Sequence, residues 1–493
     1  MKIRLNAPLG METLARMAGG RLAWRGETAA PAVSYVCTDS READGETLLC
    51  AIRGERVDGH AFLPRAAEGG CRAFLCEKLP EGWEEAHAPL GCAAIVVEDT
   101  VEALGRLANA RRAEELRALR ITAVTGSVGK TTTKEMIAAV LAGAGSLFKK
   151  DGNYNSTIGL PLSFMEISPA TKTAVLEMGM SARGEITAMT IAVCPDVAVI
   201  ANVGTSHMEY LGSRENIARA KLEIARGLRA GGTLVVNGDE PLLSALGQDF
   251  SEDRPKIPAD IRVLRLSLAG SEGADYTVTS MSARDDGMHF DLRTPTALWQ
   301  DLVVPALGEH LVWAAAFAAI VGSLYGLEEA QIKAGLLNYR PADMRQNTRV
   351  LRGVTFITDC YNAAPESMRA ALGVLSMTAA GGHCLRRIAV LGDMKELGEN
   401  TVALHRGVGA ACADKGVDLL ITVGELGAEI ARGAREAGMP AEAVCVTGGA
   451  DTYGDTAADL ATLLREGDCV LFKASRSMKL ETIAEAVMER LEH

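Results

Sequence analysis

The residues best suited to chemistry lie in one stretch, Ile121 to Thr133, which reads ITAVTGSVGKTTT. An apolar run rich in β-branched residues ends in a glycine-rich turn, and a segment compatible with a helix follows. The backbone N–H groups of such a turn and the N-terminus of the helix together bind phosphate. Lys130 would reach the terminal phosphates of a nucleotide, and Thr131 would offer its hydroxyl to magnesium. The general form of the motif requires glycine where this chain has Val124, so an ordinary glycine-rich turn is the alternative.

Further polar side chains follow two predicted strands of the same region. Glu177 ends the strand TAVLE, and His207 comes shortly after the strand DVAVIA. Since the carboxyl ends of parallel strands meet at one edge of a sheet, both should lie beside the glycine-rich turn. A carboxylate suits Mg²⁺, whereas a lone histidine is more often a core or capping residue. Lys221 lies in a predicted helix, and its spacing alone favours a solvent-exposed position.

Composition restricts the class of protein. A chain of 493 residues with 48% hydrophobic and 23% charged residues suggests about three globular domains. The net charge of −12 makes nucleic acid or an anionic membrane a poor partner. The eleven cysteines form no C-x-x-C pair, which argues against disulfides and structural zinc. The N-terminus lacks the apolar segment of a signal peptide, and no apolar run is long enough to span a bilayer, so we expect a cytoplasmic protein without membrane insertion.

The order of predicted elements indicates an α/β protein of three domains, at residues 1–114, 115–342 and 343–493. The first is a small α/β unit with strands such as VSYVCT, TLLCAI and RAFLCE. The second carries the glycine-rich turn on a parallel sheet. The third repeats a strand–helix rhythm typical of a Rossmann-like, doubly wound sheet. It has no G-x-G-x-x-G after its first strand, so a dinucleotide cofactor is not indicated.

Residues 262–305 differ in character from the rest of the second domain. Apolar and polar residues alternate there with a period of two, and the turn Asp285-Asp286-Gly287 separates two of the runs. We therefore predict an antiparallel β insertion. Two helices, at about 310–326 and 328–338, should complete the domain.

Together these motifs resemble those of the Mur ligases of peptidoglycan synthesis along nearly the whole chain. The family form T-G-[ST]-x-G-K-T-[ST] is matched from Thr125 to Thr132, so Val124 agrees with the family. GNYNSTIGLP, EMG and the ARAK that contains Lys221 also match. The motifs at Asp359 to Met368, Leu391 to Gly398 and Ser475 to Met478 are most similar to the branch that adds a dipeptide. The D-N-P-R signature of the branch that adds the third peptide residue is absent from the sequence.

The resemblance implies an ATP-dependent amide ligase. Such an enzyme would join D-alanyl-D-alanine to UDP-N-acetylmuramoyl-tripeptide through an acyl phosphate and release UDP-MurNAc-pentapeptide, ADP and phosphate. The first domain would bind the UDP end, the second ATP, and the third the dipeptide while completing the nucleotide site. The third peptide residue could be diaminopimelate or lysine. We expect a monomer.

The resemblance also implies roles for individual residues. The catalytic residues would be Lys130, Glu177, His207, Lys221, Arg345 and Asp359. The ATP contacts would be Thr125, Gly126, Ser127, Val128, Gly129, Lys130, Thr131, Thr132, Asn237, Arg345 and Asp359. Two Mg²⁺ ions would be held by Thr131, Glu177, His207 and Lys221, the last as a carbamate. The substrate contacts would be Ser40, Arg41, Asp58, His60, Asn153, Asn155, Asn362, Ser475 and Arg476.

The chain departs from the family pattern at two places. Relatives often show His-Asn-x-x-Asn in the helix after the insertion, where an asparagine contacts adenine. Here His310 is followed by Leu311 and Ala314, so adenine must be held differently. The usual DSYNANP reads DCYNAAP, in which Asn362 is the remaining amide of the second half.

Two alternatives remain open at this point. One is another amide ligase of the same superfamily, either the ligase that adds the third peptide residue or a relative of folylpolyglutamate synthetase. Folylpolyglutamate synthetases lack a UDP-sugar module of about a hundred residues before the glycine-rich turn. The other is a nucleotide-binding relative that has lost turnover. The retained Lys130, Thr131, Glu177 and Lys221 argue against that second alternative.

Overall fold

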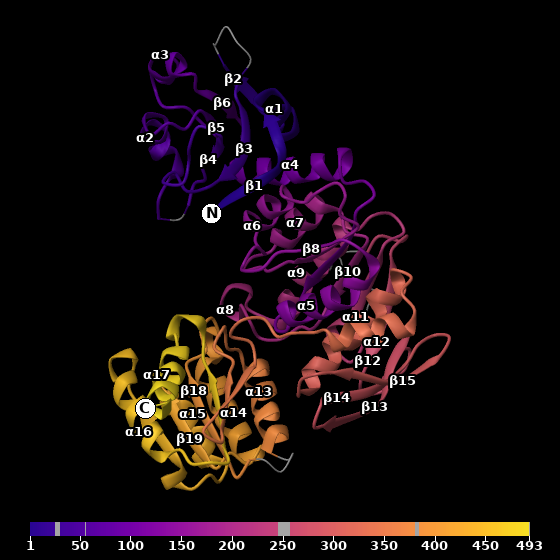
Figure 1. The fold of residues 1–493 in the computed structure, drawn as a ribbon, viewed down its shortest axis with the longest axis vertical. Helices are drawn as coiled ribbons and strands as arrows, with labels where there is room; N and C mark the ends of the chain where they lie inside the picture. The colour runs from indigo at the N-terminus through magenta and orange to yellow at the C-terminus, as the bar shows by residue number, and fades with distance from the viewer. Residues whose placement is uncertain (25–29, 55, 245–256, 380–383, 493) are drawn as a thin grey trace.

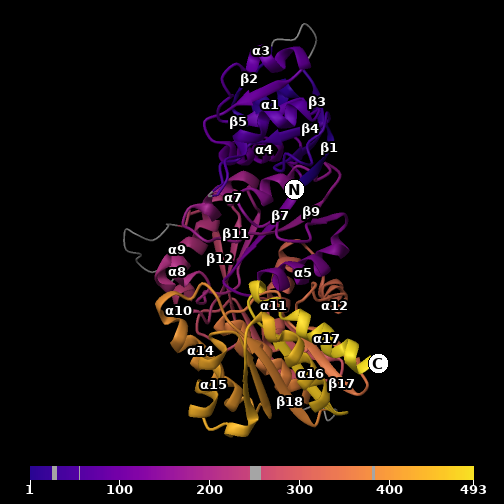
Figure 2. The ribbon, with the colours of Figure 1, turned by 90° about the vertical axis from the view of Figure 1, so that its left-hand side faces the viewer.

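A computed structural model describes residues 1–24, 30–54, 56–244, 257–379 and 384–492. Its strands form three sheets that follow one another along the chain (Figure 1). In Figure 2 the three parts are stacked, with the N-terminal sheet at the top and the C-terminal sheet at the bottom. The predicted α/β class with three units is therefore confirmed. In the described ranges, no helix is both long and apolar enough to cross a membrane.

The N-terminal sheet has the strand order β1-β3-β4-β5-β6-β2. Strands β3 to β6 run parallel, and β1 and β2 pair antiparallel at its two edges. Its elements are β1 (Lys2–Gly10), α1 (Met11–Ala18), β2 (Arg21–Ala23), β3 (Ala32–Cys37), β4 (Thr47–Cys50), α2 (Leu63–Glu68), β5 (Ala73–Cys76), α3 (Trp83–His87), β6 (Ala93–Val96) and α4 (Thr100–Glu114). The sequence pattern did not predict β1, α1 or β2.

The central sheet has nine strands in the order β15-β14-β13-β12-β11-β10-β7-β9-β8. Alternate residues of its parallel strands face opposite layers: Val124 and Val199 pack with α5, α11 and α12, whereas Ala123 and Ala198 pack with α6, α7 and α9. The strands are β7 (Arg120–Thr125), β8 (Leu147–Lys149), β9 (Thr173–Glu177), β10 (Val197–Ile200), β11 (Thr233–Asn237), β12 (Arg262–Ser267), β13 (Tyr276–Arg284), β14 (Gly287–Arg293) and β15 (Leu298–Val304). The helices are α5 (Lys130–Leu141), α6 (Gly159–Phe164), α7 (Glu185–Val193), α8 (Met208–Leu211), α9 (Arg214–Leu222), α10 (Pro241–Ser244), α11 (Glu309–Leu324) and α12 (Glu329–Leu337).

The predicted antiparallel insertion is confirmed only in part. β13, β14 and β15 are antiparallel, with the tight turn at Asp285-Asp286. β12, which we had grouped with them, pairs parallel with β11 and with the start of β13. The grouping was wrong because a period of two indicates a half-buried strand without giving the direction of its neighbour. The insertion therefore continues the central sheet rather than forming a separate one.

The C-terminal sheet has the order β16-β17-β21-β18-β19-β20, parallel except for the edge strand β16. Helices α13, α14 and α15 cover one face, and α16 and α17 cover the other. Its elements are β16 (Asn347–Leu351), β17 (Val354–Thr358), α13 (Pro365–Thr378), β18 (Arg386–Gly392), α14 (Thr401–Asp414), β19 (Leu419–Val423), α15 (Gly427–Glu436), β20 (Val444–Thr447), α16 (Tyr453–Leu463), β21 (Asp468–Lys473) and α17 (Glu481–Glu492). This is the predicted doubly wound arrangement.

Helix α4 joins the N-terminal and central parts. Arg111, on this helix, is buried and donates hydrogen bonds to the carbonyl groups of Phe164, Met165 and Ile167 at the end of α6. The hydrophobic core of the N-terminal sheet also includes Leu162 and Met165, which belong to the central part. These two parts therefore share a core across their junction.

Candidate active site

The glycine-rich turn has the geometry of a phosphate-binding loop. It connects β7 to α5, and Gly129 directly precedes the helix with φ 76°, a left-handed conformation that glycine adopts readily. A Cβ atom on Gly126 would lie 3.2 Å from the Cβ of Ala201 and from the carbonyl of Val128. The loop can therefore pack this closely only with glycine at position 126. The free N–H groups of the first turn of α5 face the same cleft as the loop.

Asn202, which the sequence did not single out, fixes this loop. Its Oδ1 accepts from the N–H groups of Ser127 and Val128, both at 3.0 Å, and its Nδ2 donates to the carbonyl of Val128. These two loop amides are thus occupied by the protein. Phosphate would be bound by the amides at the start of α5 and by the side chains around them. The buried Oγ of Ser127 has no hydrogen-bond partner among the described residues, which fits a phosphate oxygen in that position.

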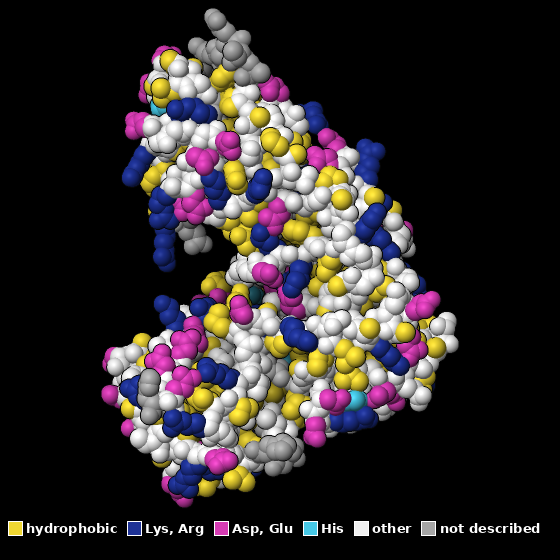
Figure 3. Space-filling model, viewed as in Figure 1, with side chains coloured by type: hydrophobic (Ala, Val, Ile, Leu, Met, Phe, Trp, Pro, Cys, Tyr) yellow, Lys and Arg dark blue, Asp and Glu magenta, His cyan; other side chains and the backbone are white. Residues whose placement is uncertain are grey.

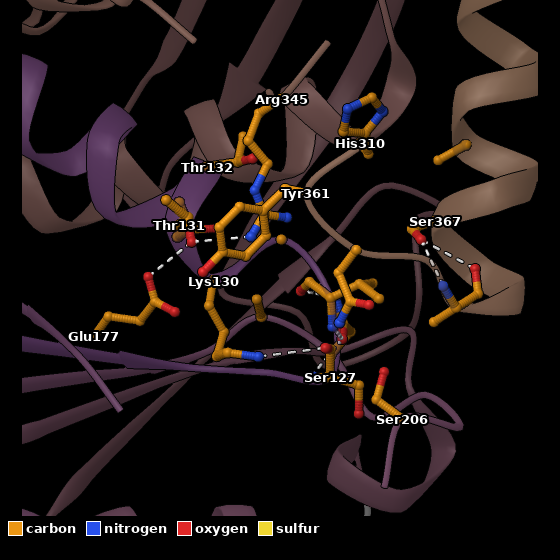
Figure 4. A pocket seen from close by; sticks show the side chains of 18 of the residues that line it. Ser127, Lys130, Thr131, Thr132, Glu177, Ser206, His310, Arg345, Tyr361 and Ser367 are labelled. Atoms are coloured by element: carbon orange, nitrogen blue, oxygen red, sulfur yellow. Dashed lines mark hydrogen bonds between the residues drawn. The ribbon is translucent and has the colours of Figure 1, made fainter. Parts of the chain in front are cut away.

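Lys130 folds over its own loop. Its Nζ donates to the carbonyl of Gly126 at 3.0 Å and approaches that of Ser127 at 3.4 Å (Figure 4). Loss of hydration in the cleft lowers the pKa of Lys130; the charge of Arg345 acts in the same direction, and Glu177 opposes it. A nucleotide phosphate at this loop would replace the carbonyl partners with a stronger, charged one.

Thr131 and Glu177 meet as predicted for a magnesium site. The Thr131 hydroxyl donates to Oε2 of Glu177 at 2.8 Å (Figure 4). The amide of Asn155 donates to Oε1 of the same carboxylate at 2.8 Å. A hydroxyl and a carboxylate side by side next to a phosphate loop are hard oxygen ligands suited to one Mg²⁺. We had predicted Asn155 as a substrate contact, and the structure shows it orienting Glu177.

Lys221 is fully buried, which reverses the position that helical spacing suggested. Its exposed fraction is 1%, and burial lowers its pKa well below the ordinary value, with the nearby charge of Lys130 adding to the shift. Among the described residues, no hydrogen bond or ion pair is found at its ammonium group. The deprotonated form of such an amine is chemically able to react with carbon dioxide, and the lowered pKa favours that form.

His207 lies at the contact between the central and C-terminal parts. It directly precedes α8 with φ 64°, and its Nδ1 lies 2.8 Å from Oε2 of Glu396. The close contact with this histidine lowers the pKa of Glu396. His207 lines the same cleft as Glu177. Within the described ranges, no group of three or more His, Cys, Asp or Glu residues is arranged to hold a metal, so a second ion would need a further ligand.

Arg345 reaches the central part from the C-terminal part. Its Nη2 lies 3.4 Å from the Thr131 hydroxyl, and its guanidinium lies over the ring of Tyr361 (Figure 4). Asp359 lines the same cleft, but its Oδ2 forms a 2.6 Å ion pair with Lys473. Lys473 is 2% exposed and also donates to the carbonyl of Asn362. Lys473 was missed because a lysine at the end of an apolar strand gives no sign of burial in the sequence.

Most of the residues above, though not Lys221, line a cleft of about 460 Å³, within the size range of small-ligand sites. One end is polar and carries the phosphate loop. The other end is apolar and lies between α11 and α13. It is lined by Leu311, Trp313, Phe317, Ala371 and Val374. His310 enters the cleft at the start of α11, and burial lowers its pKa.

Several other predicted contacts lie in or near this cleft, and their side chains bond to the protein itself. Asn237 lines the cleft, and its Oδ1 accepts from the Asp239 N–H. Asn153 and Asn362 line it as well. Ser475 and Arg476 are not among its lining residues. Ser475 accepts from the Lys395 N–H, and Arg476 forms a 2.5 Å ion pair with Glu481.

The predicted UDP contacts gather at the carboxyl ends of β3 and β4 in the N-terminal sheet. Arg41 is exposed and paired with Asp39. Asp58 accepts from Nδ1 of His60 at 2.6 Å, and Nε2 of His60 accepts from the Glu77 N–H. Both ring nitrogens of His60 are therefore occupied within the protein, and the ring is 4% exposed. His60 fixes the turn, and Ser40, Arg41 and Asp58 present the more accessible polar groups.

Comparison with known proteins agrees with this arrangement. Residues 32–112 match the Mur ligase family catalytic domain, 124–322 the Mur ligase middle domain, and 344–476 the Mur ligase glutamate ligase domain. The UDP-N-acetylmuramoyl-tripeptide–D-alanyl-D-alanine ligase of Bacillus subtilis is 38% identical over 92% of this chain and 93% of its own length.

The chain belongs to the Mur ligase family. It is therefore an ATP-dependent ligase. Among solved structures, MurF from Acinetobacter baumannii has a TM-score of 0.84 at 29% identity and covers 99% of this chain and 100% of its own. MurF from Thermotoga maritima, in complex with ADP, has a TM-score of 0.75 at 27% identity and covers 93% and 97%. This Mur ligase thus shares the whole three-part arrangement with MurF structures.

Proposed function

We propose that this protein joins D-alanyl-D-alanine to UDP-N-acetylmuramoyl-tripeptide at the expense of ATP. The observation that carries the proposal is the 38% identity to the Bacillus subtilis ligase of that name across 92% of the chain. The site agrees with it: a phosphate loop on the central part faces Arg345 and Asp359 of the C-terminal part across one cleft. Figure 3 shows a second hollow, between the N-terminal and C-terminal parts.

The first chemical step makes the tripeptide carboxylate reactive. A carboxylate is a poor electrophile, so one of its oxygens attacks the γ-phosphorus of ATP, the bond to the β-phosphate oxygen breaks, and an acyl phosphate and ADP form. Negative charge accumulates during this step, and positioned cations stabilise it. Lys130 would contact the phosphates, and Arg345 lies next to Thr131 where the transferred group would pass.

In the second step the dipeptide amine attacks the acyl carbon. The tetrahedral intermediate loses phosphate, an amide bond forms, and the amine releases a proton. The protein's contribution is to hold the reacting groups together and to exclude water, which would otherwise hydrolyse the acyl phosphate. The seam between the central and C-terminal parts can supply this exclusion. It includes hydrogen bonds from the N–H and the hydroxyl of Thr205 to the carboxylate of Glu366.

Magnesium fits the residues around Thr131. When bound there, Mg²⁺ would neutralise phosphate charge and polarise the γ-phosphate. Thr131 and Glu177 would hold one ion. A second ion would require Glu177 and His207 together with a further ligand, which the described residues do not supply in a group of three or more His, Cys, Asp or Glu. We propose that carbamylated Lys221 supplies it, since this lysine is buried, unpaired and of lowered pKa.

Adenine would lie at the apolar end of the cleft. Leu311 is there, in the position where relatives carry an asparagine, and Ala314 is buried behind it. Stacking against apolar side chains would thus replace the amide contact. We also propose a cytoplasmic, monomeric enzyme; the cytoplasmic location follows from its proposed substrates, since ATP and UDP-linked precursors are cytoplasmic.

The test is phosphate release from ATP measured with each substrate alone and with both. We expect release only when UDP-MurNAc-tripeptide and D-alanyl-D-alanine are both present. To distinguish the other amide ligases, the dipeptide is replaced by diaminopimelate, lysine or glutamate, and the tripeptide substrate is replaced by a shorter acceptor. If one of those pairs supports release and the dipeptide does not, the proposed specificity is wrong.

A further inference from the structure

We propose that Tyr361 is a positioning residue that couples the seating of the C-terminal part to the phosphate site of the central part. The inference rests on the proposed function and assigns a role to a side chain of the DCYNAAP segment for which no role has been given above. Tyr361 follows β17 and lines the cleft. Its ring contacts Arg345, and its hydroxyl contacts Asn153 of the central part.

The ring of Tyr361 supports Arg345. The guanidinium carbon lies 4.1 Å from the ring centroid, a cation–π arrangement. Arg345 itself lies between Met344 and Gln346, whose φ angles of 56° and 49° are unusual for side-chain-bearing residues. The Tyr361 N–H donates to the carbonyl of Met344 at 3.3 Å. Tyr361 thus holds this strained turn at two points and directs the guanidinium toward Thr131.

The hydroxyl of Tyr361 contacts the central part. It donates to Oδ1 of Asn153 at 2.9 Å. The same loop carries Asn155, whose amide donates to Glu177 and whose carbonyl accepts from the Gly179 N–H at 2.8 Å. Glu177 in turn accepts from Thr131. Two chains of contacts therefore start at Tyr361 and converge on Thr131, one through Arg345 and one through the loop of Asn153.

This arrangement forms only when the C-terminal part is seated against the central part. If that part moved away, the hydroxyl would lose Asn153 and the guanidinium would lose Thr131 together. Tyr361 is half-buried and is not part of the hydrophobic cores of the C-terminal sheet. Core packing alone therefore does not require its side chain. A phenylalanine would keep the ring and the N–H contact and lose only the hydroxyl.

A double-mutant cycle on full-length protein tests the hydroxyl contact. Tyr361→Phe and Asn153→Ala should each lower kcat by about 3- to 10-fold, the range expected for one lost hydrogen bond. The double variant should be no slower than the slower single variant, because both changes remove the same bond. Tyr35→Phe, on β3 of the N-terminal sheet, is the matched control for a lost hydroxyl. If the decreases in kcat of the two single variants multiply in the double variant, the hydrogen bond between Tyr361 and Asn153 does not contribute to kcat, and the proposed coupling is overturned.

The ring is tested by binding as well as by rate. Tyr361→Ala should weaken ADP binding, measured by calorimetry without other substrates, by about 3- to 10-fold through the loss of support for Arg345. Tyr361→Phe should keep ADP affinity within about twofold of the wild type, because its ring still supports the arginine. Unchanged ADP affinity in Tyr361→Ala would overturn the role of the ring.

Two readouts separate this inference from other outcomes. A merely structural role would lower the melting temperature of the Phe variant along with its rate, whereas we expect an unchanged melting temperature. If the wild type itself fails to release phosphate with both substrates, the proposed function fails, and the ADP measurements still decide the role of the ring.

Discussion

Lys221 shows how one buried side chain constrains both stability and chemistry. Its folded-state pKa lies below that of the unfolded chain, so between the two values the unfolded state binds more protons. The stability of the wild type should therefore rise with pH across that window. At neutral pH the buried lysine lowers the free energy of unfolding, unless a reaction or a bound ion changes its charge.

Replacing this lysine by methionine should stabilise the protein. In buffer freed of carbon dioxide, we expect the free energy of unfolding of Lys221→Met to exceed that of the wild type by about 1–3 kcal/mol at pH 7, a typical size for removing one unfavourably buried charged group. This difference in the free energy of unfolding should narrow as pH rises toward about 10, where the lysine of the unfolded chain also becomes neutral. Thermal unfolding at several pH values measures it. A gap that widens with pH would contradict this account.

The same residue is tested for function. Lys221→Ala should lose activity by at least about tenfold, the effect seen when groups that support a metal site are removed. A short carboxylic acid added to this variant should restore part of the activity by taking the place of the carbamate. Lys333→Ala, at an exposed i, i+4 pair on α12, serves as the control. Full activity in Lys221→Ala would remove the carbamate from the mechanism.

At the level of single residues, sequence spacing located the phosphate loop and Glu177 because a turn between a strand and a helix has a local signature. Asn202 and Lys473 carried no such signature. Their importance comes from partners 74 and 114 positions away in the chain, Val128 and Asp359. His60 was expected as a substrate contact from the family resemblance, and only the structure shows both ring nitrogens occupied.

The β13–β14 hairpin contains a second pH-sensitive element. The ring of His289 is 7% exposed and lies between two carboxylates, with Nδ1 2.7 Å from Asp301 and Nε2 2.8 Å from Asp286. Hydrogen bonding to Asp301 and then to Asp286 raises the pKa of His289, while partial burial opposes the shift. The protonated ring can donate to both acids at once.

The sign of the pH dependence follows from that raised pKa. The stabilisation from protonated His289 is fully present below its pKa in the unfolded chain, about 6.5, and is lost as pH rises through its higher pKa in the folded protein. We expect His289→Gln to lower the melting temperature by about 1–3 °C at pH 6 and by less at pH 9. Arg284→Gln, which removes a 3.4 Å contact to Asp301 from the same hairpin, is a control without a titrating histidine. An equal effect of His289→Gln at both pH values would contradict the ion pairs.

At the level of elements, periodicity predicted most strands of the three sheets, but not the edge strands β1, β2, β8 and β16, and not every pairing. β12 joined the parallel part of the central sheet because β11 precedes it and lies beside it, which no local pattern records. β1 was missed because its alternation is broken by Pro8 and Gly10, and its partner β3 lies more than twenty residues later. Edge strands of this kind are set by tertiary pairing.

The whole molecule has two unlike junctions. The N-terminal and central parts share a hydrophobic core and the buried Arg111 on α4. The C-terminal part meets the central part through polar contacts such as Glu366 to Thr205, His207 to Glu396 and Tyr361 to Asn153. Polar seams of this kind exchange readily with water, so relative motion is expected at the second junction rather than the first.

We therefore predict closure by the C-terminal part. With an ATP analogue and UDP-MurNAc-tripeptide bound, the radius of gyration from small-angle scattering should fall toward about 23 Å, the value for a compact chain of this length. Distances between labels in the N-terminal and central sheets should stay constant. An unchanged radius under saturating ligands, or movement between those labels, would contradict this division of motion.

The central claim is that one cleft carries out a dipeptide ligation that depends on three substrates. The most direct measurement is phosphate release from ATP together with mass analysis of the UDP-linked product. The account predicts release only when UDP-MurNAc-tripeptide and D-alanyl-D-alanine are both present, with a product heavier by the dipeptide less one water. Equal release of phosphate without the dipeptide, or no product of that mass, would contradict it.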